Sequence, residues 1–240
     1  MPNRRPFHRV VIVCILALLA FAVGAAQAKV ETIEVDGKAV TVERFGDARG
    51  SAPAVVLVHG SDGAGGRYRA ASRKLAAAGF NVFLVHYLDM TGGRHGRAMV
   101  ANIPVWNKAV RGAIDHAARE GGAVDGKVGV IGVSFGGVLA VLSAQQDPRV
   151  GTVVSYFGYV PRGTVTKRLP PVLILHGAKD KVVPVSWALA LQQIVQRQGV
   201  PSEIRVFPEA RHGFGAKEEV LAMQQVTAFL RRYLGPPPGK

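Results

Sequence analysis

One serine stands in a pattern that is typical of an activated nucleophile. Ser134 lies at the centre of the run GVSFG at 132–136, which follows an apolar segment and precedes a helical pattern. A serine on such a strand, turn and helix elbow has a strained backbone, so only small residues fit two positions before and after it. Gly132 and Gly136 meet that requirement. The pattern predicts a nucleophilic Ser134; the alternative is a serine that merely caps the helix.

A serine hydroxyl needs a general base, and the base needs a carboxylate that holds it in the right tautomer. In hydrolases built on this elbow the chain order is serine, acid, histidine. Only two histidines follow Ser134. His212 lies in a loop between the last predicted strand and the last predicted helix, whereas His176 ends a strand and is expected to be a buried structural imidazole. His212 is therefore the predicted base.

The acid predicted to orient His212 is Asp180. It lies in the loop after a predicted strand at 172–175, from which it can reach His212 across a neighbouring strand end. A turn or helix-capping aspartate is the alternative interpretation of Asp180. Glu209 is the alternative acid, although it is close to His212 in sequence and is expected to be exposed.

The negative oxygen that forms during acyl transfer needs two backbone N–H donors. Phe135, directly after the nucleophile, is the first predicted donor. The second should come from the glycine-rich loop at 59–66, where Ser61 is the predicted donor and Asp62 the next candidate. This loop lacks both the GxGxxG pattern and the lysine of a phosphate-binding loop, which argues against a nucleotide site.

An alternation of strands and helices must position these residues. Apolar runs without polar alternation predict strands that are buried on both faces, as in a parallel sheet. The predicted strands are 54–58, 82–85, 128–131, 150–156, 172–175 and 204–207, and the helices are about 68–78, 104–119, 136–146, 185–198 and 217–234. The alternation implies βαβ units, whose right-handed crossovers gather the loops at the carboxyl ends of the strands.

The remaining segments frame this unit. Residues 29–45 alternate polar and apolar side chains around Asp36-Gly37, which predicts an antiparallel hairpin at a sheet edge. A chain of 240 residues with 48% hydrophobic and 19% charged residues favours one globular domain, here 29–234, with a disordered tail at 235–240. No cap domain is expected, and the longest candidate lid is the loop at 88–101, with a shorter one at 158–169.

The first 28 residues have the three parts of a secretory signal peptide. A basic start precedes an apolar run at 10–24, and small residues at 26–28 suit a signal peptidase. We predict cleavage after residue 28, a periplasmic or secreted location and no stable membrane span thereafter. An uncleaved anchor is the alternative, although the run is shorter than the ~20 residues that span a bilayer. The Arg4-Arg5 pair also resembles a twin-arginine export signal.

The loss of this segment changes both the thiol content and the charge. The only cysteine, Cys14, lies within it, so the mature chain would hold no disulfide and no cysteine nucleophile. The net charge of +14 would fall to +11, from 27 basic and 16 acidic residues. Such a charge could favour nucleic acid, an anionic membrane or an anionic substrate. The basic residues are scattered and no nucleic-acid-binding motif is present, so we expect a basic surface and no nucleic-acid partner.

With these residues located, the chain resembles the dienelactone hydrolase family of the α/β-hydrolase superfamily. The matching runs are GVSFGG at 132–137, HGAKDKVVP at 176–184 and RHGF at 211–214. The resemblance implies an α/β-hydrolase fold, in which helices flank both faces of a mostly parallel central sheet without a cap domain. It also implies a triad of Ser134, Asp180 and His212, an oxyanion hole from Phe135 and the loop at Ser61, and neither a metal nor an organic cofactor.

Two departures from the family bear on the substrate. The founding enzymes use a cysteine nucleophile with a nearby glutamate, whereas this chain has Ser134 and no glutamate in the loop after His59. They also hold the substrate carboxylate with arginines, one of them shortly after the histidine, where this chain has glycine and alanine at 215–216. Ordinary serine acyl transfer is therefore expected, and dienelactone is not the expected substrate. Three arginines could form an anion clamp or be ordinary surface residues: Arg94, Arg97 and Arg211.

The predicted function is that of an exported serine hydrolase that cleaves small ester or lactone-type substrates through an acyl-enzyme. Ser134 attacks the acyl carbon, His212 relays the proton and Asp180 orients His212. Two alternatives stay open: a prolyl-peptidase-like peptidase, and a non-enzymatic envelope protein that uses the fold as a scaffold for an anionic polymer or a partner. The sequence carries no signal for an oligomeric state.

Overall fold

The structure is a computed structural model of the chain, and it describes residues 28–46, 52–93, 99–161 and 163–235. Nearly all of the predicted signal peptide and of the predicted tail lie outside the described residues. The same holds for Arg94 and Arg97, two of the three arginines considered for an anion clamp.

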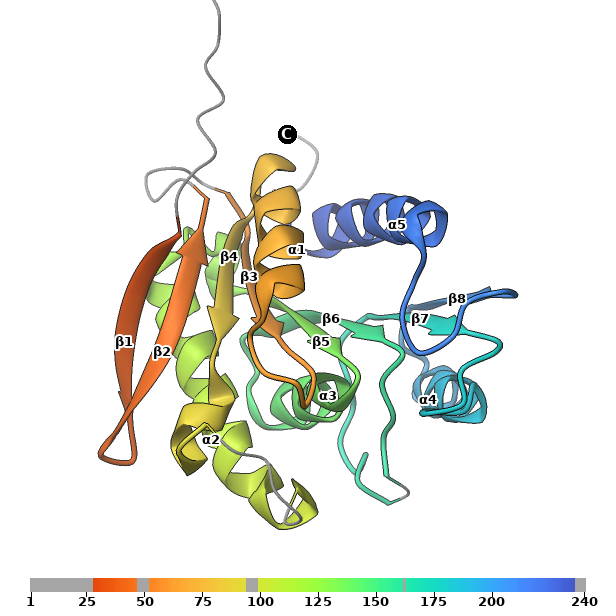
Figure 1. Ribbon diagram of the computed structural model, residues 1–240, viewed down its shortest axis with the longest axis horizontal. Coiled ribbons are helices and arrows are strands. Elements are labelled where there is room, and N and C mark those ends of the chain that lie inside the picture. Colours follow the sequence, from red (N-terminus) through yellow and green to blue (C-terminus); the bar gives the residue numbers. More distant parts are fainter. Residues whose placement is uncertain (1–27, 47–51, 94–98, 162, 236–240) are drawn as a thin grey trace, which may run out of the picture.

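Eight strands form one sheet. They are β1 (Lys29–Val35), β2 (Lys38–Phe45), β3 (Ala54–Val58), β4 (Asn81–Val85), β5 (Val128–Val133), β6 (Val150–Tyr156), β7 (Val172–Gly177) and β8 (Ser202–Phe207). Their order across the sheet is β1-β2-β4-β3-β5-β6-β7-β8 (Figure 1). The six strands from β4 to β8 in this order are parallel, and β2 pairs antiparallel with β4. The carboxyl ends of the parallel strands therefore share one edge of the sheet.

The first two strands form the predicted hairpin at the edge of the sheet. β1 pairs antiparallel with β2, from Lys29 opposite Arg44 to Val35 opposite Lys38. The turn residues Asp36 and Gly37 both have positive φ, 51° and 72°, as a two-residue type I′ turn requires.

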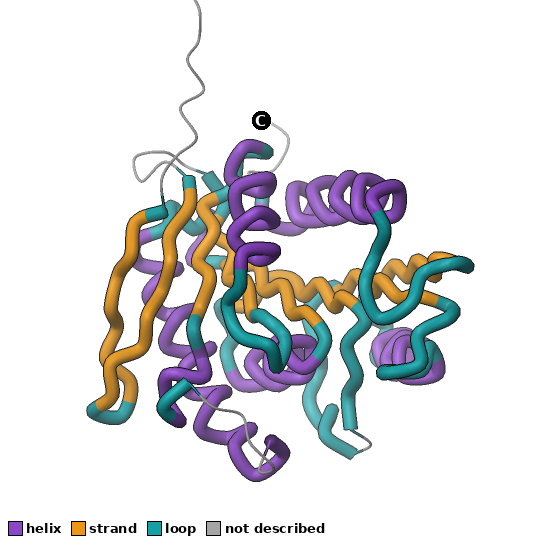
Figure 2. Tube along the Cα trace, in the orientation of Figure 1, coloured by secondary structure: helices purple, strands orange, loops and turns teal. Residues whose placement is uncertain are grey.

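Five α-helices cover the two faces of the sheet, as the predicted fold class requires. They are α1 (Gly66–Ala77), α2 (Met99–Glu120), α3 (Phe135–Gln146), α4 (Ser186–Arg197) and α5 (Ala216–Leu234), with short 3-10 helices η1 (Tyr87–Thr91) and η2 (Val124–Gly126). α1 and α5 pack on one face, and α2, α3 and α4 pack on the other. Figure 2 shows the sheet as one twisted layer with helices on both sides.

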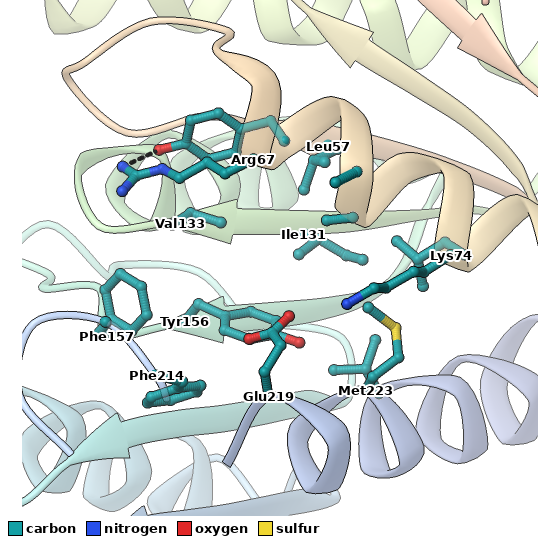
Figure 3. A pocket seen from close by; sticks show the side chains of 16 residues that line it. Leu57, Arg67, Lys74, Ile131, Val133, Tyr156, Phe157, Phe214, Glu219 and Met223 are labelled. Carbon is teal, nitrogen blue, oxygen red and sulfur yellow. Dashed lines mark hydrogen bonds between the residues drawn. The ribbon is translucent and has the colours of Figure 1, made fainter. Parts of the chain in front are cut away.

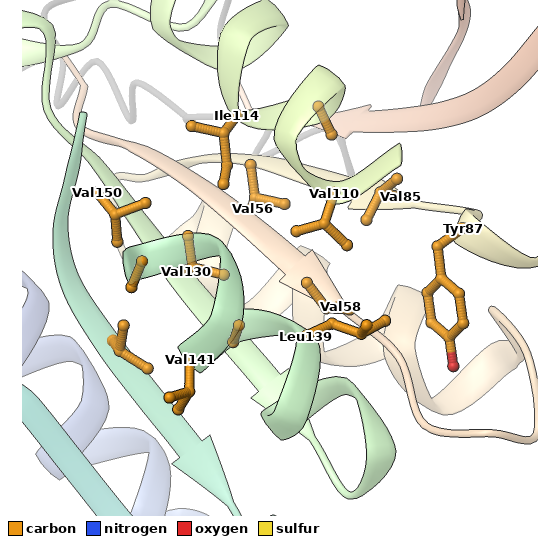
Figure 4. Close-up of a cluster of buried hydrophobic side chains, with 14 of the residues drawn as sticks. Val56, Val58, Val85, Tyr87, Val110, Ile114, Val130, Leu139, Val141 and Val150 are labelled. Atoms are coloured by element: carbon orange, nitrogen blue, oxygen red, sulfur yellow. The ribbon is translucent and has the colours of Figure 1, made fainter. Parts of the chain in front are cut away.

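Two clusters of buried apolar side chains hold these layers together. On the face of α2 and α3, Ile114 and Leu139 pack with the sheet residues Val56 and Val130 (Figure 4). A second cluster joins α1 and α5 to the opposite face, and Phe229 of α5 is 1% exposed within it. Each fully buried side chain of this kind contributes about 1.5–3 kcal/mol relative to an exposed one, so both faces are firmly attached.

Two predictions about these elements differ from the structure: the start of one helix and the burial of the last strand. Helix α2 begins at Met99 rather than at Pro104, because Met99 and Ile103 also pack against the core and extend the helix before the proline. The candidate lid at 88–101 is thereby shortened by η1 at one end and by α2 at the other. The strand β8 is not buried on both faces, since it is the last strand of the sheet and leaves Arg205 and Val206 exposed.

A buried carboxylate ties the hairpin to the parallel part of the sheet. Glu43 of β2 is 4% exposed and accepts two hydrogen bonds from Arg69 Nε, at 2.7 and 3.0 Å, and one from Arg69 Nη2 at 2.6 Å. It also lies 2.7 Å from His86 Nε2, at the end of β4. Burial raises the pKa of Glu43, but the hydrogen bonds from Arg69 and His86 outweigh it and leave the pKa below the usual value.

We expect Arg69→Met to lower the free energy of unfolding at neutral pH by about 2 kcal/mol, because it leaves Glu43 ionised and largely buried. The loss stays below the roughly 3–5 kcal/mol of a fully buried pair, since Arg69 itself is half-exposed. Arg119→Met, which removes an exposed ion pair with Asp115, should cost about 0–1 kcal/mol. A lowered pKa stabilises the fold above the ordinary glutamate pKa, so the loss should shrink as the pH falls below about 4.5. Urea denaturation at several pH values measures both effects, and equal losses in the two variants would contradict this role of Glu43.

Candidate active site

Ser134 occupies a strained turn between β5 and α3. Its backbone has φ 53° and ψ −118°, a positive φ that residues other than glycine seldom adopt. A Cβ added at Gly132 would overlap the carbonyl of Gly136, and one added at Gly136 would overlap the carbonyls of Val58 and His59. Only glycine fits at both positions, as the sequence pattern predicts. The turn therefore holds Ser134 against the loop that follows β3.

Two hydrogen bonds join Ser134, His212 and Asp180 in a chain. Ser134 Oγ lies 2.9 Å from His212 Nε2, and His212 Nδ1 lies 2.8 Å from Asp180 Oδ2. The carboxylate accepts, so Nδ1 carries the proton and Nε2 is free to accept the serine proton. The Asp180 side chain is fully buried, and its other oxygen accepts the N–H groups of Val182 and Val183 at 2.8 and 2.9 Å. These two bonds fix the carboxylate toward the imidazole.

The loops that carry Asp180 and His212 touch each other because a glycine separates them. A Cβ at Gly177, the last residue of β7, would overlap the carbonyls of Ala210 and Arg211. The N–H of Lys179 donates to the Ala210 carbonyl at 2.9 Å, which ties the two loops together. This close approach brings Asp180 and His212, 32 residues apart in sequence, into contact.

The residues considered as alternatives lie elsewhere. The Glu209 side chain is 74% exposed and pairs with Lys179. His176 is buried, as predicted, and its Nε2 donates to the Val183 carbonyl at 2.8 Å. Burial lowers the pKa of His176, so it is a neutral structural imidazole that supports the loop of Asp180. Among the carboxylates that the structure describes, Asp180 is the one bonded to the His212 ring.

Two backbone N–H groups are available beside Ser134. Phe135 is the first residue of α3, and the first N–H groups of a helix have no acceptor within it. The loop after β3 passes on the other side, since a Cβ added at Gly60 would lie 3.5 Å from Ser134 Cβ. In the described part of the chain the N–H of Ser61 has no acceptor. Both predicted donors are therefore unpaired within the described residues; Phe135 directly follows the serine, and Ser61 lies in the loop that borders it.

Two aromatic residues near the site were not predicted. Phe157 follows β6 with a positive φ of 36°, and its ring meets the His212 ring edge-on at 4.9 Å between centroids. Tyr87 follows β4, is fully buried and donates a hydrogen bond to the Gly60 carbonyl at 3.0 Å. Both stand directly at or just after the carboxyl end of a parallel strand, the same signal that indicates Ser134 and Asp180.

The described residues show neither a cluster of metal ligands nor a membrane-spanning helix. They contain no group of three or more His, Cys, Asp or Glu side chains that could hold a metal ion. Across the same residues, every helix is too short or too polar to cross a bilayer. Arg211 is exposed and directly precedes His212 in the chain. It is the one described residue of the three arginines considered for an anion clamp.

A cavity of about 350 Å³ lies between α1 and α5, on the face of the sheet that these two helices cover. Gly213 and Phe214, which follow His212, line this cavity together with Lys74, Glu219 and Met223. Figure 3 shows Lys74 reaching from α1, and Glu219 and Met223 from α5, into the same space. Burial raises the pKa of Glu219, and the charge of Lys74 offsets only part of this effect.

The chain matches the model of one protein family, described as the dienelactone hydrolase family, over residues 42–231. It is 30% identical over 118 residues to a putative carboxymethylenebutenolidase of Yersinia pestis, a match that covers 43% of this chain and 44% of the relative. It is 25% identical over 190 residues to a putative carboxymethylenebutenolidase of Escherichia coli (strain K12), covering 70% of this chain and 69% of the relative. The chain thus spans under half of one relative and about two thirds of the other.

The chain is also similar to a solved structure and, over a short segment, to a peptidase sequence. A solved structure, a putative dienelactone hydrolase from Klebsiella pneumoniae, superposes with a TM-score of 0.73 at 22% identity, covering 86% of this chain and 99% of that one. This match supports the fold. A probable dipeptidyl-peptidase 5 of Aspergillus flavus is 40% identical over 72 residues, which are 30% of this chain but 10% of the relative.

Replacement of the half-buried carboxylate of Glu219 in the cavity should stabilise the protein at neutral pH. A glutamate whose folded pKa is raised lowers stability once it ionises, so this loss is absent well below pH 4.5 and grows as the pH rises through the folded pKa. We therefore expect Glu219→Gln to raise the Tm at pH 7 and to leave it unchanged near pH 3.5. Glu209→Gln, at an exposed site, should change the Tm little at either pH. A lower Tm for Glu219→Gln at pH 7 would show that the ionised carboxylate is stabilising instead.

Proposed function

Because the chain belongs to the dienelactone hydrolase family, we propose that it is an exported serine hydrolase that cleaves small ester or lactone-type substrates through an acyl-enzyme on Ser134. Hydrolysis of ester or lactone bonds follows from the family itself. The serine mechanism rests on one observation, the hydrogen-bonded chain from Ser134 through His212 to Asp180. Its order and tautomer are those that a serine nucleophile requires.

Acylation begins when Ser134 Oγ attacks the acyl carbon and His212 Nε2 accepts the hydroxyl proton. The carbonyl oxygen becomes negative in the tetrahedral intermediate, where the N–H groups of Phe135 and Ser61 stabilise it. The intermediate collapses when His212 gives its proton to the departing alkoxide, which leaves an ester on Ser134. Asp180 keeps its charge throughout and stabilises the imidazolium that forms twice in each cycle.

Deacylation repeats these steps with water. His212 Nε2 accepts a proton from a water molecule, whose oxygen attacks the acyl carbon, and the proton then returns to Ser134 Oγ as the acid product leaves. In a lactone the alkoxide and the acyl group belong to one molecule, so the ring-opened hydroxy acid stays attached to Ser134 until this second step.

Two features support small or surface-accessible substrates. No separate helical domain is inserted over the site in the described part of the chain, and Ser134 is half-buried rather than enclosed. The rings of Tyr159 and Trp187 are half-buried, and their centroids lie 5.9 Å apart. The Tyr159 ring also lies 6.4 Å from the ring of Phe135, the residue after Ser134. Apolar acyl or alcohol groups fit such a wall.

Export is proposed from the sequence of residues 1–28 and predicts a periplasmic or secreted protein. The support is the basic start, apolar run and small residues of that segment. Expression of the full chain should yield an exported protein whose N-terminus is Lys29. Recovery of the whole protein in the membrane fraction with Met1 or its successor intact would instead support an uncleaved anchor.

A peptidase is the second candidate, favoured by the 72-residue similarity to a probable dipeptidyl-peptidase 5. The same serine, base and acid could cleave an amide, but the leaving amine must be protonated by His212 as it departs. Comparison of p-nitrophenyl butyrate with an aminoacyl arylamide separates the two: an ester hydrolase should strongly prefer the former. A higher kcat/KM for the arylamide would favour the peptidase.

We expect Ser134→Ala and His212→Ala each to lower kcat on p-nitrophenyl butyrate by roughly 10⁴–10⁶, because each removes a group that bonds to or shuttles the reacting atoms. Asp180→Asn should cost about 10⁴, since an amide donor opposite Nδ1 favours the wrong tautomer. Glu209→Gln is the matched control for the acid and should keep full activity, because Glu209 faces solvent.

Labelling by a fluorophosphonate locates the activated hydroxyl in the same variants. It should vanish in Ser134→Ala and persist in Glu209→Gln. Equal ester turnover by the unchanged protein and by Ser134→Ala would overturn the proposed serine mechanism.

A further inference from the structure

Both polar groups of Gly60 are held by buried tyrosine hydroxyls. Its N–H donates to Tyr68 Oη of α1 at 2.9 Å, and its carbonyl accepts the hydroxyl of Tyr87 in η1 at 3.0 Å. The carbonyl also accepts a hydrogen bond from His59 Nδ1 at 2.6 Å and a longer one from the Gly63 N–H at 3.4 Å. A single glycine carbonyl with two buried side-chain donors is fixed in direction much more firmly than a loop carbonyl in solvent.

The direction of this carbonyl sets the direction of the next N–H. The Gly60 carbonyl and the Ser61 N–H belong to one planar peptide unit, which is trans because no cis peptide bond occurs in the described residues. In a trans unit the two groups point in opposite directions. The donors that pull the Gly60 carbonyl inward therefore turn the Ser61 N–H outward. This N–H has no acceptor within the described part of the chain, and the loop that carries it borders Ser134.

The rings that supply these donors are themselves immobilised. Tyr87 and His59 are 0% and 1% exposed, and their rings stack with centroids 4.2 Å apart and planes 20° apart. Tyr87 also packs 5.5 Å from Trp106 and 6.4 Å from Phe135, the other proposed oxyanion donor. Figure 4 shows Tyr87 at one end of the core cluster of α2 and α3. The hydroxyl position is therefore set by the core, and the core includes the residue that follows the nucleophile.

Both groups remain donors over the working pH range. Burial lowers the pKa of His59 to about 4, so the imidazole is neutral, and the carbonyl acceptor requires its proton on Nδ1. Burial also raises the pKa of Tyr87, so the hydroxyl keeps its proton. Neither hydrogen bond should be lost to titration between roughly pH 6 and 9.

We propose that Tyr87, together with His59, is a positioning residue for catalysis: its hydroxyl aims the Ser61 N–H at the oxygen that becomes negative in the tetrahedral intermediate. The inference rests on the proposed serine mechanism and extends it to a residue that touches neither the substrate nor the triad. Because the Ser61 N–H is needed most when the charge develops, its aim should affect the transition state more than substrate binding.

The test is Tyr87→Phe, which keeps the ring and removes one hydroxyl. We expect kcat on p-nitrophenyl butyrate to fall about tenfold, less than the roughly 10²–10³ of a lost donor because His59 still holds the carbonyl. KM should stay within about twofold, the signature of an interaction made only in the transition state. Tyr156→Phe is the matched control, since it removes a buried hydroxyl from the opposite face of the sheet and should leave kcat unchanged.

A second measurement separates positioning from a general structural role. A trifluoromethyl ketone forms a tetrahedral oxyanion on the active serine, whereas an unreactive amide of the same shape binds without it. In Tyr87→Phe the affinity for the ketone should fall about as much as kcat, with the amide affinity unchanged. The Tm of Tyr87→Phe should fall only slightly below that of Tyr156→Phe, since one buried hydrogen bond is lost, and the kcat loss should be constant over roughly pH 6–9.

The outcomes distinguish this inference from the proposed function. If the unchanged protein hydrolyses the ester and Tyr87→Phe retains its kcat and its ketone affinity, the positioning role is wrong while the serine mechanism stands. Equal losses of ketone and amide affinity, with a strongly lowered Tm, would likewise overturn it in favour of a structural role. If the unchanged protein neither hydrolyses esters nor binds the ketone covalently at Ser134, the proposed function fails and this inference fails with it.

Discussion

The close approach of Gly136 to the end of β3 is the constraint on which the rest of the site depends. The backbone of Gly136 lies against the carbonyls of Val58 and His59, with no room for a side chain. β3 and β5 are hydrogen-bonded neighbours, and Val58 pairs with Gly132. The strain of Ser134 is maintained because this contact, the sheet register and the start of α3 all fix the same few backbone atoms. Ser134 and the loop at 59–66 are consequently held as one unit.

A second close approach of a glycine to neighbouring carbonyls occurs on the other half of the sheet. Gly177 at the end of β7 lies against the carbonyls of Ala210 and Arg211, after β8. One pair of neighbouring strands therefore presents Ser134 with the two proposed oxyanion donors, and another pair presents Asp180 with His212. The hydrogen bond between Ser134 and His212 joins the two halves. β6 lies between them, and its next residue, Phe157, packs its ring on the imidazole.

Much of this arrangement could be predicted from the sequence because it follows from topology. Apolar runs without alternation gave the parallel strands, and the loops after their carboxyl ends contain Ser134, Asp180 and His212 in the required order. The role of the glycines at 132 and 136 could also be predicted, because a turn of this kind leaves no room for a side chain at either position. The edge position of β8 was not, since a short apolar run looks alike in the centre and at the margin of a sheet. Pro104 misplaced the start of α2, because core contacts of Met99 and Ile103 outweigh the proline signal.

The orientation of the oxyanion loop could not be predicted in the same way. The sequence indicates that a donor should lie near Ser61, but the aim of its N–H depends on which side chains reach the Gly60 carbonyl. Tyr87 belongs to another strand end, 27 residues from Gly60, and only the packed structure brings its hydroxyl within hydrogen-bonding distance. Phe157 is similar, because its contact with His212 depends on a positive φ that no residue pattern announces. Contacts such as those of Tyr87 and Phe157 are therefore found from the three-dimensional structure and not from the sequence.

The central claim is that hydrolysis proceeds through an ester on Ser134, and the most direct measurement is to trap that ester. Rapid acid quenching during turnover of p-nitrophenyl butyrate, followed by mass spectrometry of proteolytic fragments, should show one butyryl group on the fragment that contains Ser134. The group should appear within the first turnover, together with a stoichiometric burst of p-nitrophenol if deacylation is the slower step. Steady hydrolysis with no acyl group on that fragment, or with the acyl group on another residue, would contradict the account.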